Sequence, residues 1–345
     1  MKPETLKDIA KELNLSISTV SRVVNGKGYV KEETRQRVLD FLATRNYVPN
    51  EIARSLKAQE SMTIGIILPD LREVYFNRII KEIDRVVSAA GYMLLIADTN
   101  ESKKTERRYL DLMFQKRVDA LVISTIDMDP AETPYVERYL NNGTPIIFID
   151  NHPKLDSDQV NFVVLDNHQA SRLAVQTLID NGHRDIAVIA GYLDEPTGYE
   201  RMEGYCQAME ANNLHPDPAL IAIGNFKADG GYRCMEELLL QRDVHPFTAV
   251  HVASEMMTIG ALRAIREHGL TVGQDIAVIG FDVHDDLGLA TPTIATVRQP
   301  EEEVGQRVGL MLLQLLRPEK YGAPEETKVW VKAYLQSGSS IHKLQ

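Results

Sequence analysis

Residues 5–25 read TLKDIAKELNLSISTVSRVVN, and their apolar spacing predicts two short helices separated by a tight break. The first helix has one apolar face at i, i+3, i+4 and i+7, formed by Leu6, Ile9, Ala10 and Leu13. Ser16 follows the break and is placed to cap the second helix, in which Val20 and Val24 turn inward. The stretch therefore predicts two helices that pack against each other through a small apolar core.

The second helix has a polar face opposite its valines, formed by Ser18, Ser21, Arg22 and Asn25. Small hydroxyl side chains let a helix approach base edges closely, and an arginine can pair with guanine through two hydrogen bonds or grip a phosphate. This face indicates a helix-turn-helix that reads the DNA major groove. Two helices of an ordinary bundle would show the same spacing, so the spacing alone leaves that alternative open.

The residues that follow favour a DNA-binding head. Residues 32–45 predict a third helix whose Val38, Phe41 and Leu42 can close a three-helix core, and Pro49 ends the unit. The first 60 residues hold 11 Lys and Arg against 8 Asp and Glu, whereas the rest of the chain holds 27 against 41. A basic head on an acidic body is expected to direct the head alone toward a polyanion.

Length and composition limit the class of protein. A chain of 345 residues with 44% hydrophobic content predicts two or three domains with a large core. It has no run of about 18 apolar residues and no export signal, so we expect a cytoplasmic protein without a membrane span. Cys206 and Cys234 are 28 residues apart and are expected to be idle thiols rather than a disulfide or a metal site.

Beyond residue 60, short apolar runs alternate with amphipathic helices, among them residues 76–90, 171–181 and 258–268. The runs that we expect to form strands buried on both faces are residues 64–68, 93–97, 120–123, 146–149, 162–165, 186–189, 249–252, 276–279 and 294–297. Repeated strand–helix–strand units predict an α/β fold with parallel sheets covered by helices. About eleven strands are many for one sheet, so we expect two doubly wound lobes with a cleft between them.

Polar residues directly after these strands are candidates for a binding site, because ligands of such folds bind at the carboxyl ends of strands. The candidates are Asp150, Arg201, Phe226, Ser254, Glu255 and Asp282. Carboxylates accept hydrogen bonds from hydroxyls, arginine donates in a fixed fork, and an aromatic ring covers an apolar sugar face. Each residue alone is better explained by a cap or a turn. Together they predict a site for a polyhydroxylated ligand.

The chain resembles the LacI/GalR family of bacterial transcriptional repressors over nearly its whole length. The motifs that carry this resemblance are residues 5–10 (TLKDIA), 16–25 (SISTVSRVVN), 46–50 (NYVPN) and 53–56 (ARSL). The resemblance implies a head at residues 1–49, a hinge helix and linker at 50–60, and an effector-binding and dimerisation domain at 61–340. Within that domain it implies one lobe of about residues 61–160 and 292–320, and a second of about 161–291 and 321–340.

The resemblance also implies roles for individual residues on DNA. Ile17, Ser18 and Arg22 would read bases, although helical spacing alone placed Ile17 on the inner face. Residues that would mostly grip the phosphate backbone are Thr5, Thr19, Ser21, Asn25 and Tyr47. In the hinge, Asn50 and Ala53 would contact DNA, and Leu56 would wedge into the minor groove at a central step. Such a wedge costs a few kcal/mol, so two subunits are required.

In the effector domain the resemblance implies a ligand site at Tyr75, Phe76, Asp150, Arg201, Phe226, Ser254 and Asp282. The family's loop after the first strand often contains Asn-Pro, which is Glu73-Val74 here, and its later Asn-Asp is Ser254-Glu255. Both departures lie at the implied pocket. The implied effector is a sugar or sugar phosphate that releases the repressor from carbohydrate genes. A corepressor-dependent, purine-type regulator is the alternative.

The implied partners are a pseudo-palindromic operator duplex and a second copy of the chain, with no cofactor and no membrane. Two heads on a two-fold operator require a homodimer. Residues 335–340 are too polar for a tetramer-forming heptad tail, so a dimer is expected.

Two other classes of protein fit the sequence less well. A sugar-binding protein without a regulatory role would have no use for residues 1–57. An enzyme is not expected, because the sequence has no HExxH, GxxxxGK[ST], GxGxxG or GxSxG motif. The acidic loop containing Asp282, His284, Asp285 and Asp286 could bind a metal in principle, but a solvated loop is the better interpretation.

Overall fold

The computed structural model describes residues 6–24, 28–45, 60–126, 134–152, 160–284 and 291–344. The chain forms two compact units, residues 1–61 and 62–345. Among the helices of the described residues, none combines the length and apolar character needed to cross a bilayer. Both cysteines are free thiols; Cys234 is buried and Cys206 partly so, as the sequence predicts.

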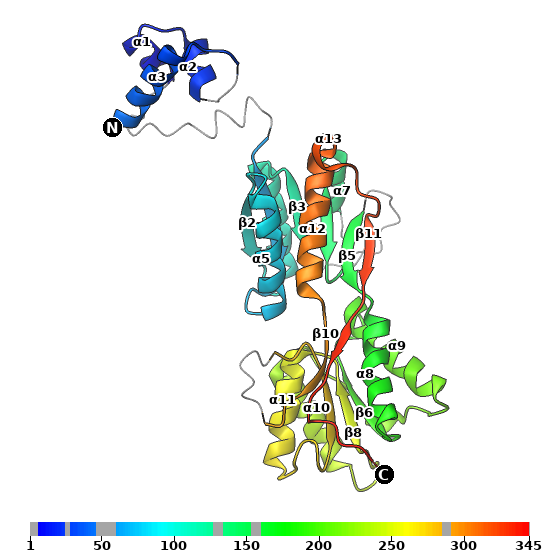
Figure 1. Ribbon diagram of the computed structural model, residues 1–345. Helices are drawn as coiled ribbons and strands as arrows, with labels where there is room; N and C mark the ends of the chain where they lie inside the picture. The colour runs from blue at the N-terminus through cyan, green and yellow to red at the C-terminus, as the bar shows by residue number, and fades with distance from the viewer. Residues whose placement is uncertain are drawn as a thin grey trace. The chain divides into compact units, whose positions relative to one another are not determined.

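The first unit is a bundle of three helices, α1 (Leu6–Glu12), α2 (Ile17–Val24) and α3 (Glu32–Thr44) (Figure 1). Ser16 begins α2 as expected, because its side-chain oxygen accepts a hydrogen bond from the Thr19 backbone nitrogen at 3.1 Å. The buried core consists of Ile9, Ala10, Leu13, Val20, Val23 and Val38. Val23, rather than the expected Val24, is the more buried valine at the end of α2.

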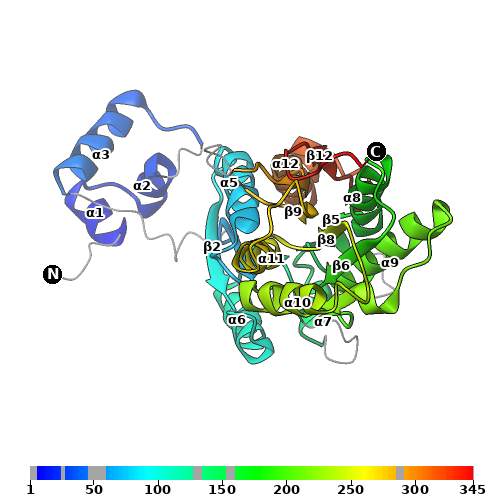
Figure 2. The same ribbon diagram turned by 90° about the horizontal axis from the view of Figure 1, so that it is seen from below.

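The second unit contains two sheets of six strands each, which confirms the α/β fold with two lobes (Figures 1 and 2). The first sheet has the strand order β11-β5-β4-β3-β1-β2 and is parallel throughout. The elements of this lobe are β1 (Thr63–Leu68), α5 (Val74–Ser88), β2 (Met93–Asp98), α6 (Lys103–Lys116), β3 (Ala120–Ile123), α7 (Pro134–Asn141), β4 (Ile146–Ile149), β5 (Asn161–Leu165), α12 (Glu301–Leu316), α13 (Pro318–Tyr321) and β11 (Lys328–Val331).

The second sheet has the order β12-β10-β9-β8-β6-β7, and only its β10–β12 pair is antiparallel among the described strands. The elements of this lobe are α8 (Asn167–Asp180), β6 (Ile186–Ala190), α9 (Pro196–Ala211), a 3₁₀ turn (Pro218–Leu220), β7 (Ile221–Ile223), α10 (Ala228–Leu240), β8 (Ala249–Val252), α11 (Glu255–Glu267), β9 (Ala277–Phe281), β10 (Ala295–Arg298) and β12 (Tyr334–Gln336). Most strands of both sheets are buried along their length, as parallel sheets covered by helices require.

The chain passes between the lobes three times, and each passage lies later in the sequence than expected. It crosses after β5, after β10 and between β11 and β12. The expected lobe boundaries at residues 160, 291 and 320 are therefore wrong: β5 and β11 belong to the first sheet and β10 to the second. Hydrophobic pattern identifies a strand but not the sheet that it joins, since both sheets demand the same buried apolar run.

Two further expectations need correction. Strand β2 is not buried on both faces: it is the edge of its sheet, and Met93, Leu95 and Ile96 are 66%, 39% and 41% exposed. The apolar run was sufficient to predict the strand but not its place in the sheet. Strands β11 and β12 were not predicted, because alternation in short edge strands near charged and glycine residues is weak.

Candidate functional site

A cavity of about 330 Å³ is lined by residues of both lobes in the second unit. The first lobe contributes the residues around α5, the start of α6 and the end of β4. The second lobe contributes the start of α9, the β7–α10 connection, the start of α11 and the end of β9. The lining residues singled out from the sequence are Tyr75, Phe76, Asp150, Arg201, Phe226, Ser254, Glu255 and Asp282.

Three of these residues adopt left-handed backbone conformations. The φ angles are +61° at Asp150, +59° at Phe226 and +53° at Asp282. Asp150 directly follows β4, and Asp282 directly follows β9. Positive φ is uncommon for residues other than glycine, costs of the order of 1 kcal/mol or more, and concentrates at functional sites. Its occurrence at three lining residues supports a functional role for this cavity.

Arg201 is buried in the wall of the cavity, where it is 6% exposed. It lies on the second turn of α9, not after a loop as the sequence suggested, because α9 begins at Pro196. Its Nε donates to the Asn167 side-chain oxygen at 2.8 Å, and its Nη1 donates to the Ala253 carbonyl at 2.7 Å. The guanidinium stacks 3.6 Å from the centroid of the Phe281 ring. These contacts fix the orientation of the fork.

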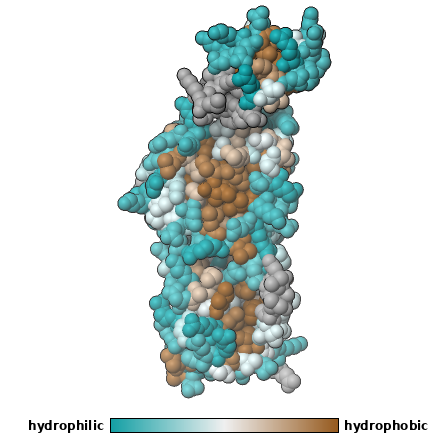
Figure 3. Space-filling view, turned by 90° about the vertical axis from the view of Figure 1, so that its left-hand side faces the viewer, coloured by the Kyte–Doolittle hydropathy of each residue, from teal (hydrophilic) through white to brown (hydrophobic). Residues whose placement is uncertain are grey.

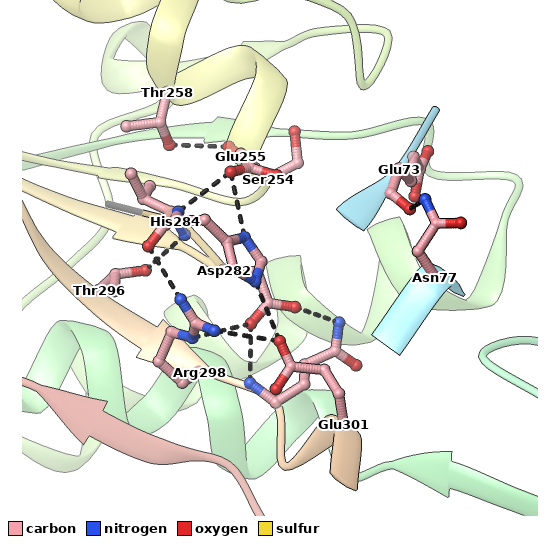
Figure 4. A network of polar contacts seen from close by, with 12 residues as sticks. Glu73, Asn77, Ser254, Glu255, Thr258, Asp282, His284, Thr296, Arg298 and Glu301 are labelled. Carbon is pink, nitrogen blue, oxygen red and sulfur yellow. Dashed lines mark hydrogen bonds and ion pairs between the residues drawn. The ribbon is translucent and has the colours of Figure 1, made fainter. Parts of the chain in front are cut away.

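A polar network joins Asp282 to the segment that crosses from β10 to α12 (Figure 4). Asp282 accepts hydrogen bonds from the Gln299 backbone nitrogen at 2.8 Å and from its side-chain amide at 2.5 Å. His284 lies between Glu255 and Glu301, at 3.1 and 3.0 Å. Burial alone would lower the pKa of His284, but the hydrogen bonds to both carboxylates raise it to about 9. A charged His284 therefore links the cavity wall to a lobe-crossing segment.

Several carboxyl groups around the cavity have raised pKa values. Desolvation in the cleft raises the pKa of Glu73 to about 8, and the negative charge of Asp150 adds to the shift. Burial raises the pKa of Asp150 to about 6, although Arg201 opposes it. Burial and the charge of Asp150 raise the pKa of Glu195 to about 7. Glu73 and Glu195 are the N-cap residues of α5 and α9, but neither side chain accepts a hydrogen bond from a backbone nitrogen of its helix.

Aromatic rings line the remaining surface of the cavity. Tyr75 and Phe76 make an edge-to-face pair with centroids 5.1 Å apart, and both are buried. Tyr192 lies 6.1 Å from the Phe226 ring. A Cβ added at Gly191 would overlap the Phe226 ring, so this glycine leaves the space that the ring occupies. The cavity thus combines hydrogen-bond acceptors, one fixed arginine and flat apolar surfaces.

The structure brings all seven residues expected to bind a ligand to this one cavity. Ser254 also serves as the N-cap of α11, accepting a hydrogen bond from the Met257 nitrogen at 3.3 Å. The sequence did not single out Glu101, Lys103, Asn151, Tyr192, Glu195, Thr197 and Gln299, which line the cavity as well. Thr197 lies about one helical turn before Arg201 on α9, and that spacing could have identified it. Glu195 is the N-cap residue of α9, and the spacing does not identify it.

The polar face of α2 is accessible to solvent. Ile17 is 50% exposed, Ser18 and Arg22 are exposed, and Thr19 and Ser21 are partly exposed. Ile17 therefore points outward, as the family resemblance implied and helical spacing alone did not. The other residues implicated in DNA binding lie outside the described residues; these are Thr5, Asn25, Tyr47, Asn50, Ala53 and Leu56.

The described residues contain no group of three or more His, Cys, Asp or Glu side chains that could hold a metal ion. Asp285 and Asp286 lie outside the described residues, while His284 is engaged by Glu255 and Glu301 as described above.

Comparison with protein families gives two matches. Residues 61–336 match the family of periplasmic binding proteins and the sugar-binding domain of the LacI family, and residues 5–50 match the bacterial regulatory proteins of the LacI family. Together these matches cover most of both structural units.

Curated relatives and solved structures agree with that assignment. The chain is 35% identical over 309 residues to the HTH-type transcriptional repressor PurR of Escherichia fergusonii, covering 90% of this chain and 89% of the relative. PurR of Klebsiella pneumoniae is 34% identical with the same coverage.

Among solved structures, a lac repressor dimer bound to operator and an anti-inducer has a TM-score of 0.86 at 28% identity, covering 99% of this chain and all of that one. A complex of the transcriptional regulator CelR with cellobiose has a TM-score of 0.73 at 28% identity, covering 98% and 99%. These relatives are DNA-binding regulators rather than enzymes. The chain belongs to the LacI family and is a ligand-responsive, DNA-binding transcriptional repressor.

Proposed function

We propose that α2 reads an operator half-site in the major groove and that Ile17, Ser18 and Arg22 make the contacts with bases. The observation that carries this proposal is the exposure of these three side chains on one helix whose opposite face is buried in the core of the head. Thr19 and Ser21, together with Thr5, Asn25 and Tyr47, would grip the backbone. Asn50, Ala53 and Leu56 would act in the hinge.

The experiment is an in vitro selection of operator sequences with the full chain, followed by binding measurements on an Arg22→Ala variant. Loss of a bidentate contact with guanine should cost about 1–3 kcal/mol and relax specificity at one base position. Arg35→Ala removes the same charge from α3 and should keep the sequence preference. Unchanged affinity and preference in Arg22→Ala would remove this residue from the reading surface.

We propose that a polyhydroxylated, sugar-like effector binds the cavity and releases the repressor from carbohydrate genes. The support is the set of carboxylate acceptors, the fixed fork of Arg201 and the Phe226 ring within one cavity. Sugars need such acceptors for their hydroxyls and a flat surface for their apolar face. An effector changes DNA affinity only if it prefers one arrangement of the lobes.

A corepressor-dependent, purine-type regulator is the second candidate. The observation that favours it is the group of rings of Tyr75, Phe76 and Phe226, because a flat heterocycle stacks between aromatic side chains. The sign of the response separates the two candidates: an inducer weakens operator binding, and a corepressor strengthens it.

We also propose that two copies pair through an exposed apolar surface, formed by Met93, Leu95 and Ile96 on β2 and by Met256 and Ile259 on α11. Figure 3 shows apolar side chains gathered on this side of the second unit. An edge strand with exposed apolar side chains is a favourable pairing surface, and a large apolar patch marks an interface. Such a repressor acts in the cytoplasm, where chromosomal DNA is present.

The test of this surface is sedimentation of a Leu95→Lys variant. A charge placed in the interface should convert the dimer to a monomer and weaken operator binding, because one head alone makes half of the contacts. Leu112→Lys is the matched control, since Leu112 is exposed on α6 and lies outside the proposed surface. A Leu95→Lys protein that sediments as a dimer would place the interface elsewhere.

A further inference from the structure

Carboxyl groups outnumber cationic side chains in the lining of the cavity. Among the described residues it is lined by six carboxyl groups, those of Glu73, Glu101, Asp150, Glu195, Glu255 and Asp282. Two cationic side chains, Lys103 and Arg201, line it as well. The helix N-termini of α5 and α9 each add only about half a positive charge. A ligand that fills this cavity is therefore surrounded mainly by carboxyl groups, and those with raised pKa values would ionise beside a bound cation.

Half of these carboxyl groups have partners within the protein. Glu101 pairs with Lys227 at 2.7 Å, and Glu255 with His284 at 3.1 Å. Asp282 accepts two hydrogen bonds from Gln299 and lies 3.8 Å from the Arg298 guanidinium. The negative charges of these three groups are therefore balanced within the protein.

The other three carboxyl groups have no cation within ion-pair distance among the described residues. Asp150 receives only two long hydrogen bonds, from the Ser124 hydroxyl and the Asn151 amide, each at 3.3 Å. The side chains of Glu73 and Glu195 make no hydrogen bond or ion pair within the described residues. Arg201 attracts Asp150 and Glu73 and so opposes the rise of their pKa values, but among the described residues it forms an ion pair with neither. Two of its nitrogens donate to Asn167 and to Ala253.

The three groups share one region of the cavity. Asp150 repels both Glu73 and Glu195, and this repulsion contributes to the raised pKa of each. Glu73 and Asp150 come from the first lobe and Glu195 from the second, and all three line the same cavity. A positive charge placed there would attract carboxylates of both lobes and would favour their approach.

A second observation points to a ligand at the same place. Tyr75 is 6% exposed, lines the cavity, and its hydroxyl makes no hydrogen bond within the described residues. Because the hydroxyl is not among the buried atoms that lack a partner, it opens into the cavity, where a polar ligand group can bind it. The aromatic ring also suits an ammonium group, which is attracted to ring faces.

We propose that the effector carries a protonated amine, which binds between Glu73, Asp150 and Glu195. This inference rests on the proposed ligand-responsive function and specifies the ligand's chemistry. The charge of Asp150 disfavours phosphorylated sugars and other anions in this part of the cavity. The ammonium group belongs to an amino sugar or to a linear polyamine. An amino sugar has hydroxyls that Asp282 and Arg201 would bind, and a linear polyamine has none.

The test compares matched pairs of probes by calorimetry on the full chain near neutral pH. The pairs are D-glucosamine with D-glucose, D-galactosamine with D-galactose, and putrescine with 1,4-butanediol; hypoxanthine and glucose 6-phosphate complete the panel. An ammonium-to-carboxylate contact should favour an amine over its neutral partner by about tenfold or more. Binding by sugar amines alone assigns an amino sugar, and binding by putrescine assigns a polyamine.

Two further readouts separate a bound ammonium from a general change in the protein. Amine binding should release protons, seen as a dependence of the heat on the buffer, because carboxyl groups with raised pKa values must ionise. Glu195→Gln and Glu73→Gln should each reduce amine affinity about tenfold. Glu210→Gln, an exposed position at the far end of α9, is the matched control and should not change it.

The inference fails if hypoxanthine, glucose 6-phosphate or a neutral sugar binds as tightly as any amine, or if no amine of the panel binds at millimolar concentration. The proposed function fails separately. A neutral compound that changes operator affinity would support the regulatory function and contradict only the amine proposal. Operator binding that is unchanged by a bound amine would contradict the regulatory function and leave the amine proposal intact.

Discussion

The residues that define the cleft are held in unfavourable backbone conformations by their surroundings. Asp150 and Asp282 each have a positive φ directly after a buried strand. Phe226 also has a positive φ, and its ring lies against Gly191. Such strain persists only where neighbouring contacts fix the conformation. The sequence could place these residues at strand ends, because apolar runs locate the ends. It could not show that Asp282 would be bound by Gln299, 17 residues later and on a crossing segment.

Gly191→Ala tests whether the position of the Phe226 ring matters. The new Cβ would overlap the ring, which must then swing away from the cavity. We expect ligand affinity to fall about tenfold or more while the fold is kept, because the ring borders the cavity and has room to move. So close a contact between the new Cβ and the ring costs about 1–3 kcal/mol or more. Gly143→Ala is the control for a loss of stability away from the ring, because its φ of +74° strains an alanine although the new Cβ meets nothing within 4 Å. Equal loss of ligand affinity in both variants would mean that the ring position is irrelevant.

The elements that connect the lobes determine how a bound ligand could be sensed. The β10–α12 segment carries Arg298, Gln299 and Glu301, and all three contact the loop after β9. Sequence pattern predicted β10 but assigned it to the wrong lobe, because periodicity carries no information about strand order. It likewise could not predict the position of His284 between two carboxylates that lie 29 and 17 residues away.

His284 should make stability depend on pH. Its pKa is raised from 6.5 to about 9, so its contribution is complete below pH 6.5 and is lost as the pH rises through about 9. The charged groups around it are Glu255, Glu301 and Arg298. We expect a His284→Gln protein to be less stable than the wild type by on the order of 1–3 kcal/mol near pH 6, with a smaller gap near pH 10.

Denaturant unfolding across this pH range measures that gap. His268→Gln is the control, because His268 is exposed at the end of α11 and should show no such dependence. A gap between wild type and His284→Gln that stays constant from pH 6 to pH 10 would show that the imidazole is not a charged partner of these carboxylates.

At the scale of the whole molecule, the chain combines a helical DNA-reading unit with a two-lobed ligand-binding unit. The sequence predicted this organisation for two reasons. Apolar residues recur at helical spacing in the first unit and form short strand-length runs between helices in the second, and the two units differ in the sign of their net charge. It did not predict the surplus of carboxylates in the cleft, because Glu73, Glu101 and Glu195 come together only through the packing of α5, α6 and α9. Effector chemistry is therefore the property least accessible from sequence.

The central claim is that occupancy of this cleft and binding of the operator are thermodynamically coupled. Coupling is reciprocal, so operator must change effector affinity by the same factor by which effector changes operator affinity. The most direct measurement is a calorimetric titration of the tightest-binding member of the probe panel into the full chain, with and without a saturating selected operator duplex. We expect the two affinities to differ by about 5–150-fold, the range of typical allosteric couplings. Identical affinities with and without operator would contradict the claim.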